Sequence, residues 1–138
     1  MGTLFAVYIF NYQLLAITRS KMISSLSAGI SAISSFSAKM NVTANNVANT
    51  NTDGFKKSRT ILKEGQHGGV APIVDQVDTP GPVKQISEDG ATREAEASNV
   101  DLAEELTSSI ATQSAYSANL KTIQTADEML GTLVDLMA

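Results

Sequence analysis

The chain has 138 residues, which is enough for one domain, and it contains no cysteine and no tryptophan. The absence of cysteine excludes disulfide bonds and thiolate metal sites. The net charge is −4, but basic residues dominate positions 1–63 and acidic residues dominate positions 64–138. Such a distribution favours attraction between the two halves, within a subunit or between neighbours, and an acidic chain is a poor match for nucleic acid.

Residues 1–21 form an apolar N-terminal extension that is interrupted at Asn11, Tyr12 and Gln13. The uninterrupted part is shorter than the roughly 20 apolar residues of a membrane span, so we expect no stable membrane span. The extension also lacks the basic start and the cleavage site of a signal peptide. We interpret it as the product of an over-long gene start, with Met22 as the natural first residue. The alternative is an authentic extension with an apolar anchoring role.

A heptad-like spacing of apolar residues begins after Met22 and predicts a helix over residues 23–49. The apolar positions of this seam are Leu26, Ile30, Ile33, Met40 and Val47.

The helix pattern ends in an asparagine-rich segment, residues 44–55. Asparagine side chains bind nearby backbone groups and favour turns over helix. Gly54 permits a positive φ, and Phe55 is apolar enough to fold back as an anchor. We therefore predict a signature turn made by Asn45, Asn46, Asn49, Asn51, Gly54 and Phe55. We interpret the basic residues 56–59 as a solvated turn, or alternatively as a partner for acidic groups in an assembly.

Residues 61–97 form a short region that is rich in glycine and proline, which break helices. Within it, residues 70–77, 83–87 and 92–97 have the composition of short strands separated by turn residues. We predict a small β-hairpin or meander that needs to pack on the helices or on a neighbour.

A second helix is predicted over residues 98–138, with Ser98 as the N-cap and Asp101 three residues later. Its seam contains Leu102, Leu106, Tyr116, Leu120, Ile123, Leu130 and Val134. Because the middle region reverses the chain, this helix should pair with residues 22–60. The predicted fold class is mainly α, with long N- and C-terminal helices paired as an antiparallel coiled coil and a small β-hairpin region between them.

No pattern of residues indicates an enzyme. The single histidine, His67, lies in a glycine-rich segment with no carboxylate spaced to orient it. The adjacent acids in the second helix do not face each other, and Gly68-Gly69 lacks the lysine of a phosphate loop. We therefore expect no catalytic residue, no metal, no cofactor and no small-molecule substrate.

Two segments carry a resemblance to a known family. Residues 44–55 read ANNVANTNTDGF and resemble the N-terminal signature ANNVANTNTPGF of the bacterial flagellar rod and hook (axial) proteins, with Asp53 in place of the usual proline. Residues 98–106 and 124–130 are similar to the C-terminal helix of the same family. Two long motifs in the expected order are more specific than either one alone.

The resemblance implies a structural subunit of the flagellar basal body that supports motility. It further implies self-assembly through the terminal helices into a homo-oligomer with other flagellar axial proteins, after transport through the flagellar type III export apparatus. The short middle region favours a rod component over a hook protein. The alternative is a coiled-coil adaptor or chaperone-like module that binds a flagellar partner helix. Self-association distinguishes the two functions, because a rod subunit polymerises whereas an adaptor forms a complex of small, fixed stoichiometry.

Overall fold

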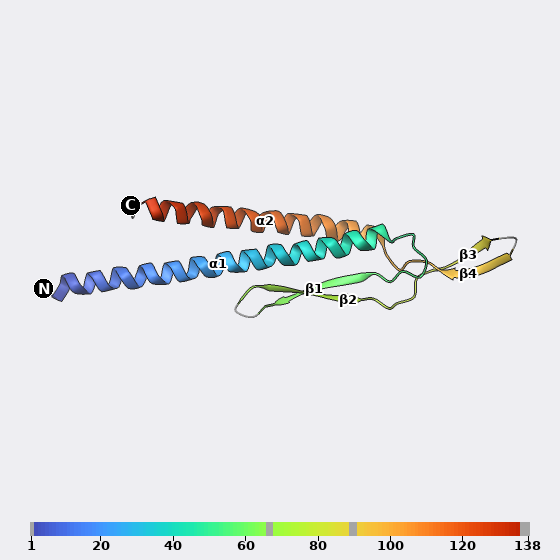
Figure 1. The fold of residues 1–138 in the computed structure, drawn as a ribbon, viewed down its shortest axis with the longest axis horizontal. Helices are drawn as coiled ribbons and strands as arrows, with labels where there is room; N and C mark the ends of the chain where they lie inside the picture. Colours follow the sequence, from blue (N-terminus) through green and yellow to red (C-terminus); the bar gives the residue numbers. More distant parts are fainter. Residues whose placement is uncertain (1, 66–67, 89–90, 136–138) are drawn as a thin grey trace.

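The computed structural model describes residues 2–65, 68–88 and 91–135, and its two helices dominate an elongated molecule (Figure 1). The elements in chain order are α1 (Gly2–Ala48), β1 (Ser58–Glu64), β2 (Val70–Gln76), β3 (Val83–Glu88), β4 (Ala91–Glu96) and α2 (Leu102–Asp135). The helices lie side by side and run in opposite directions, so the first residues of α1 and the last residues of α2 lie at one end of the molecule. The predicted class, two long helices in contact with small β structure between them, is confirmed.

Helix α1 begins at Gly2, not at residue 23 as predicted. No glycine or proline occurs between residues 3 and 28, so nothing in this stretch interrupts a helix. The helix ends at Ala48, where the amide of Asn49 donates to the carbonyl oxygens of Asn45 (3.2 Å) and Asn46 (3.1 Å). Within the part of the chain that the structure describes, no helix has the length and apolar character to cross a membrane.

Helix α2 begins at Leu102, and its N-cap is Asp101 instead of the predicted Ser98. The Asp101 carboxyl oxygen Oδ1 accepts hydrogen bonds from the amides of Ala103 (2.9 Å) and Glu104 (3.2 Å). Ser98 closes a turn before the helix, where its hydroxyl accepts from the Val100 amide at 3.2 Å. Asn99, which lies between Ser98 and Asp101, is hydrogen-bonded to the segment that precedes β3.

The β region consists of two separate antiparallel hairpins. β1 pairs with β2 from Ser58↔Gln76 to Glu64↔Val70, and β3 pairs with β4 from Val83↔Glu96 to Glu88↔Ala91. The predicted strands at 70–77, 83–87 and 92–97 are confirmed, but β1 was not predicted and two hairpins replace one. The β1–β2 hairpin packs along α1, whereas β3–β4 projects past the helices and packs on no other described helix or strand.

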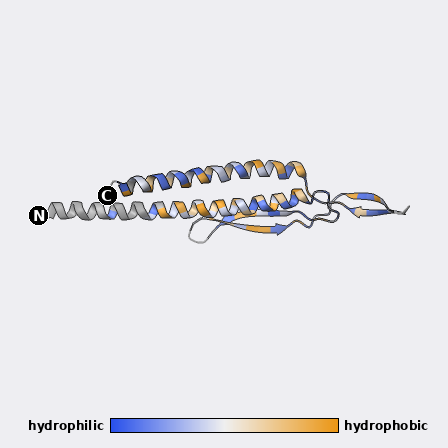
Figure 2. Ribbon diagram, turned by 45° about the horizontal axis from the view of Figure 1, so that its top comes forward, coloured by the Kyte–Doolittle hydropathy of each residue, from blue (hydrophilic) through white to orange (hydrophobic). Residues whose placement is uncertain are grey.

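The interior of the molecule contains very little apolar surface. Among the residues whose side chains the structure describes, Ala32 is the one buried hydrophobic residue, and the buried polar residues are Ser35, Thr43, Asn46, Ser98, Glu105 and Thr112. Figure 2 shows hydrophobic residues distributed along both helices and strands instead of collected into a core. Burial of apolar area is the main stabilising term in folding. Because so little apolar area is buried within this chain, contacts within the chain contribute little hydrophobic stabilisation.

Candidate assembly surface and its polar junction

The two helices, β1 and the segment before α2 meet at a polar junction, and Asn46 lies at its centre. Asn46 is 1% exposed. Its Nδ2 group donates to the Ser58 carbonyl oxygen (2.7 Å) and to Glu105 Oε1 (2.9 Å), and its Oδ1 accepts from the Ser58 amide (2.9 Å). One α1 side chain thus fixes both the start of β1 and the first turn of α2.

Asn99 makes a second set of bonds next to the start of β1. Its Oδ1 accepts from the Lys57 amide at 2.7 Å, and its Nδ2 donates to the carbonyl oxygens of Val77 and Thr79, both at 2.8 Å. The Val77 amide in turn donates to the Lys57 carbonyl oxygen at 2.9 Å. Asn99 therefore holds together the chain entering β1 and the chain leaving β2.

The asparagine-rich segment forms the turn that the sequence predicts, and Gly54 adopts a φ of +68°. The Gly54 amide donates to the Glu96 carbonyl oxygen at 2.8 Å, and the carbonyl oxygen of the half-buried Phe55 accepts from the Asn99 amide at 3.3 Å. Asn49 Nδ2 donates to the Asn45 carbonyl oxygen at 2.9 Å. Asn45 and Asn51 are exposed, so the four asparagines are not equivalent, and Asn46 alone among them is buried.

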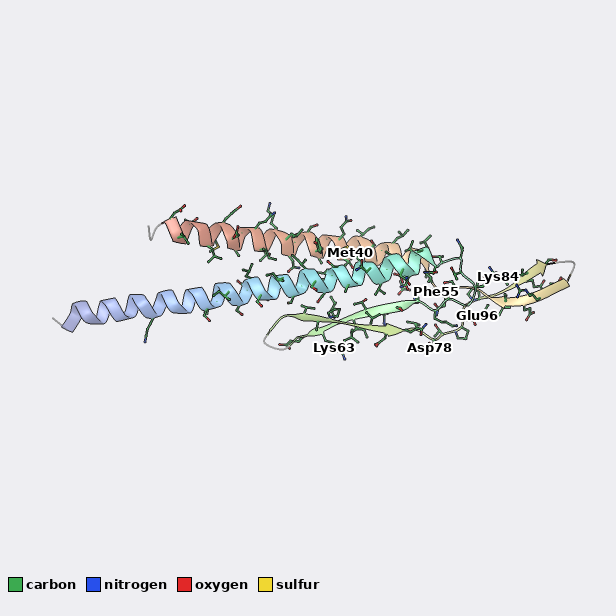
Figure 3. The ribbon with its side chains drawn as sticks, viewed as in Figure 1. Met40, Phe55, Lys63, Asp78, Lys84 and Glu96 are labelled. Atoms are coloured by element: carbon green, nitrogen blue, oxygen red, sulfur yellow. The ribbon has the colours of Figure 1, made fainter. Side chains whose placement is uncertain are left out.

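Ion pairs attach the base of the β3–β4 hairpin to this turn. Glu96 pairs with Lys56, and its Oε1 also accepts from the Gly81 amide at 2.6 Å. The Lys56 bond, followed by the Gly81 amide, lowers the pKa of Glu96 below its usual 4.5. Asp53, at the position where the family signature has proline, pairs with Lys84 at 2.5 Å. Figure 3 shows Phe55, Lys84 and Glu96 close together, between the C-terminal end of α1 and the β3–β4 hairpin.

The basic residues 56–59 are not the solvated turn that the sequence suggested. Lys57 Nζ lies 2.6 Å from Glu104 Oε2 on α2, and Lys56 pairs with Glu96 on β4, so acidic residues of the same chain meet both lysines. The strand β1 begins at Ser58, inside this basic segment. The opposite charges of the two halves of the chain therefore meet within one subunit at this junction.

A cleft of about 420 Å³ lies between α1, β1 and the start of α2, but its lining indicates no chemistry. Its three basic residues, Lys39, Lys57 and Arg59, share the lining with the acidic residues Glu104 and Glu105. Within residues 2–65, 68–88 and 91–135, no three His, Cys, Asp or Glu side chains are grouped to hold a metal ion. His67 lies outside the described residues.

The predicted seam residues divide into two groups. Half-buried are Leu26, Ile33, Met40, Val47, Tyr116, Ile123 and Leu130, whereas Ile30 (56% exposed), Leu102 (44%), Leu106 (51%), Leu120 (39%) and Val134 (65%) are exposed. The side chains of the second group are therefore less covered within the chain, and the seam stays a prediction for both groups. Their role in contacts between subunits stays a prediction.

The face of α2 that is covered carries small and polar residues. It includes the buried Glu105 and Thr112 and the half-buried Ala115 and Asn119, a row with steps of seven, three and four residues. Small side chains allow the helix backbones to approach closely, as at Gly29, where an added Cβ would lie 3.0 Å from Ile123 Cγ1. At the start of α2 the larger apolar residues Leu102, Leu106 and Ile110 lie on exposed faces, whereas Ile123 and Leu130 are half-buried farther along the helix.

The comparisons with known proteins match both helices. A family model for the C-terminal region of flagellar basal body rod FlgEFG proteins matches residues 93–136, and a model for flagella basal body rod proteins matches residues 26–56. The chain belongs to the flagellar basal-body rod protein family. This family is structural and not enzymatic, and it places the chain with the proteins of the basal-body rod.

One curated relative is the flagellar basal-body rod protein FlgG of Bacillus subtilis (strain 168). It is 51% identical over 43 residues, which are 31% of this chain and 16% of the relative. The match thus spans about a sixth of the relative's length. The matched family ranges contain most of the polar junction, including Asn46, Gly54, Asn99 and Glu105, whereas residues 2–25 and the β1–β2 hairpin lie outside them.

Proposed function

We propose that this chain is an axial structural subunit of the flagellar rod that self-assembles through its two terminal helices and contacts other axial proteins. The observation that carries the proposal is the distribution of apolar residues. Ala32 is the one buried hydrophobic residue among those whose side chains the structure describes, while Ile23, Ile30, Leu102, Leu106, Ile110, Met129 and Val134 are 44–72% exposed along the two helices. Exposed apolar area of this extent marks contact surfaces.

The polar junction gives the subunit a defined shape for such contacts. Asn46 and Asn99 fix the angle at which β1 leaves α1 and α2 returns along it, so every copy presents the same helix faces. In a tubular assembly each contact recurs in every subunit, and a small change of angle accumulates along the tube. The proposal also includes export by the flagellar type III apparatus before assembly, as expected for axial proteins.

Fractionation of cells tests the proposal directly. A strain without this chain should lose motility in soft agar, and antibody to the chain should detect it in purified basal bodies of the parent strain. Detection in the cytoplasm alone, at a fixed stoichiometry with one flagellar partner, would instead establish the adaptor function and contradict a place in the rod.

A further inference from the structure

The cleft between α1, β1 and the start of α2 indicates no reaction, but it has an excess of positive charge. Its volume is about 420 Å³, which lies within the roughly 300–1,000 Å³ of typical ligand sites. Three basic and two acidic residues line it, namely Lys39, Lys57, Arg59, Glu104 and Glu105. A single carboxylate from another molecule would therefore balance the charge of the lining.

The excess charge belongs to Lys39 and Arg59, because the other charged groups have partners within the chain. Lys57 Nζ lies 2.6 Å from Glu104 Oε2, and Glu105 Oε1 accepts a hydrogen bond from a side chain of α1 at 2.9 Å. No described carboxyl group forms an ion pair with Lys39 or Arg59. Lys39 is half-buried, and a cation that is partly removed from water is usually paired. The two cations therefore favour an anion between them.

The pairing of β1 with β2 leaves every second residue of β1 without a partner in the hairpin. The Val77 amide donates to the Lys57 carbonyl oxygen, and the Gly65 amide donates to the Gly69 carbonyl oxygen, each at 2.9 Å. Bonded and non-bonded pairs alternate along an antiparallel ladder, so residues 59, 61 and 63 bond to β2. The backbone groups of residues 58, 60, 62 and 64 therefore point away from β2, along the outer edge of β1.

This outer edge borders the charged cleft at Thr60. The side chain of Asn46 occupies both backbone groups of Ser58, which is the first residue of the edge. Thr60 is the next residue of the edge, and it lines the cleft. Within the described part of the chain, no group bonds to the outward amide or carbonyl of Thr60. The cleft thus combines two unpaired cations with one donor and one acceptor on a free strand edge.

We propose that the cleft binds an extended segment of a partner protein that carries one carboxylate side chain. The carboxylate pairs with Lys39 and Arg59, and the backbone of the segment bonds to the outward amide and carbonyl of Thr60, as in strand addition at a sheet edge. A phosphate is a poorer ligand, because its second negative charge would lie beside the two glutamates. The contact does not use the exposed apolar residues of the helices, so it goes beyond the proposed function.

Binding of short peptides to the full-length chain tests the proposal. The probe is a fluorescein-labelled pool of capped pentapeptides with glutamate at the centre and valine, threonine or isoleucine elsewhere. The comparison pool has glutamine at the centre. Because hydrogen bonds to ionised groups are stronger than neutral ones, equilibrium dialysis should show at least about tenfold tighter binding of the glutamate pool. This preference should decrease as the salt concentration rises, since salt screens the charges.

Replacement of the two cations should remove the preference for glutamate. We expect Lys39→Ala and Arg59→Ala each to abolish most of it. The matched control is Lys63→Ala, because Lys63 is an exposed basic residue of β1 that does not line the cleft and lies near the turn of the β1–β2 hairpin (Figure 3). This control should keep the preference, and circular dichroism should show unchanged secondary structure in all three variants. Equal losses in all three would indicate attraction by overall charge and overturn the proposal.

Thr60→Val separates binding from folding. Among the described residues, Thr60 Oγ1 is the one buried side-chain oxygen or nitrogen without a hydrogen-bond partner. Valine has nearly the same shape and no hydroxyl, so this variant should unfold at the same or a higher urea concentration. It should nevertheless bind the glutamate pool less tightly, because a segment beside Thr60 gives the hydroxyl a partner once the side chain turns toward it. Lower stability with unchanged binding would assign Thr60 to folding alone and overturn the contact at this edge.

A small carboxylic acid is the competing ligand for the cleft. N-acetylglutamate amide, which is a single capped residue, measures this alternative by competition in the same dialysis. Binding as tight as that of the pool would assign the cleft to a small acid and overturn the extended segment. Equal binding of the glutamate and glutamine pools would overturn the whole inference. Neither result bears on the proposed function, which depends on the apolar faces of the helices.

Discussion

Replacement of Asn46 by alanine should destabilise the chain far more than replacement of its neighbour Asn45. Asn46→Ala removes three hydrogen bonds and leaves the Ser58 amide, the Ser58 carbonyl and the Glu105 carboxyl group without this partner. A buried polar group left unpaired costs about 1–3 kcal/mol. The Ser58 groups are only partly buried, so the expected cost is about 3–4 kcal/mol in total, of which the higher helix propensity of alanine recovers about 0.5 kcal/mol.

Asn45→Ala is the matched control, because Asn45 is exposed in the same helical turn and gives alanine the same advantage in propensity. We expect urea denaturation, followed by far-UV circular dichroism, to show a loss of about 3 kcal/mol in unfolding free energy for Asn46→Ala. That is a large part of the roughly 5–15 kcal/mol of a typical domain. Asn45→Ala should change it by less than about 0.5 kcal/mol. Equal midpoints for the two variants would refute the account of the junction.

A pair of variants tests whether Asn46 acts through Glu105. Asn46→Asp keeps the shape of the side chain but places two carboxyl groups against each other and removes the donor to Ser58. Adding Glu105→Gln supplies a donor again, because the glutamine amide can bond to the new aspartate. The double variant should therefore be more stable than Asn46→Asp alone. Strictly additive losses would indicate that the two side chains are not coupled.

Three further predictions concern the turn, the projecting hairpin and the helix faces. Gly54→Val should cost about 1–3 kcal/mol and Gly54→Asn much less, since asparagine tolerates a positive φ and an added Cβ meets no atom within 4 Å; thermal unfolding compares the two. Because the pKa of Glu96 is lowered, its carboxylate stabilises the folded chain above pH 4.5, and this stabilisation is lost as the pH falls through the lowered pKa. NMR spectra of the parent chain and of Glu96→Gln should therefore differ at neutral pH and converge in acid. Leu120→Asp should abolish assembly and motility, while the subunit is still exported and its helix content is unchanged. Ile123→Asp should have the same effects and should also lower the stability of the chain, whereas Lys121→Ala should do little. Soft-agar motility, with immunodetection of the subunit in exported and basal-body fractions, checks all three variants.

Most of the fold could be predicted from the spacing of apolar residues and from the residues that favour turns. The heptad spacing predicts both helices, and the Gly54-Phe55 pair after the asparagine run predicts a turn with positive φ, which the structure confirms. Strand β1 was not predicted, because its sequence SRTILKE has charged residues near both ends and only three adjacent uncharged ones that favour a strand. It is a strand because β2 pairs with it and Asn46 fixes its start, and both partners are distant in sequence.

The helix contact was harder to predict than the helices. Hydrophobicity selects Leu102, Leu106 and Leu120 as the seam, whereas the structure covers Glu105 and Thr112. A single sequence does not distinguish apolar residues that pack within a chain from those that pack between chains, since both follow the same helical spacing. Asn46 and Asn45 are likewise indistinguishable in the sequence. Asn46 is buried and Asn45 is exposed because β1 begins beside Asn46.

We expect other copies of this chain to cover the exposed apolar faces of α1 and α2. Sedimentation velocity of the purified full-length protein over a range of concentrations tests this expectation. The sedimentation coefficient should rise with concentration toward large, open-ended species, and Leu106→Asp should reverse this rise without loss of helix content. A single slow species at every concentration, identical for the parent chain and Leu106→Asp, would contradict it.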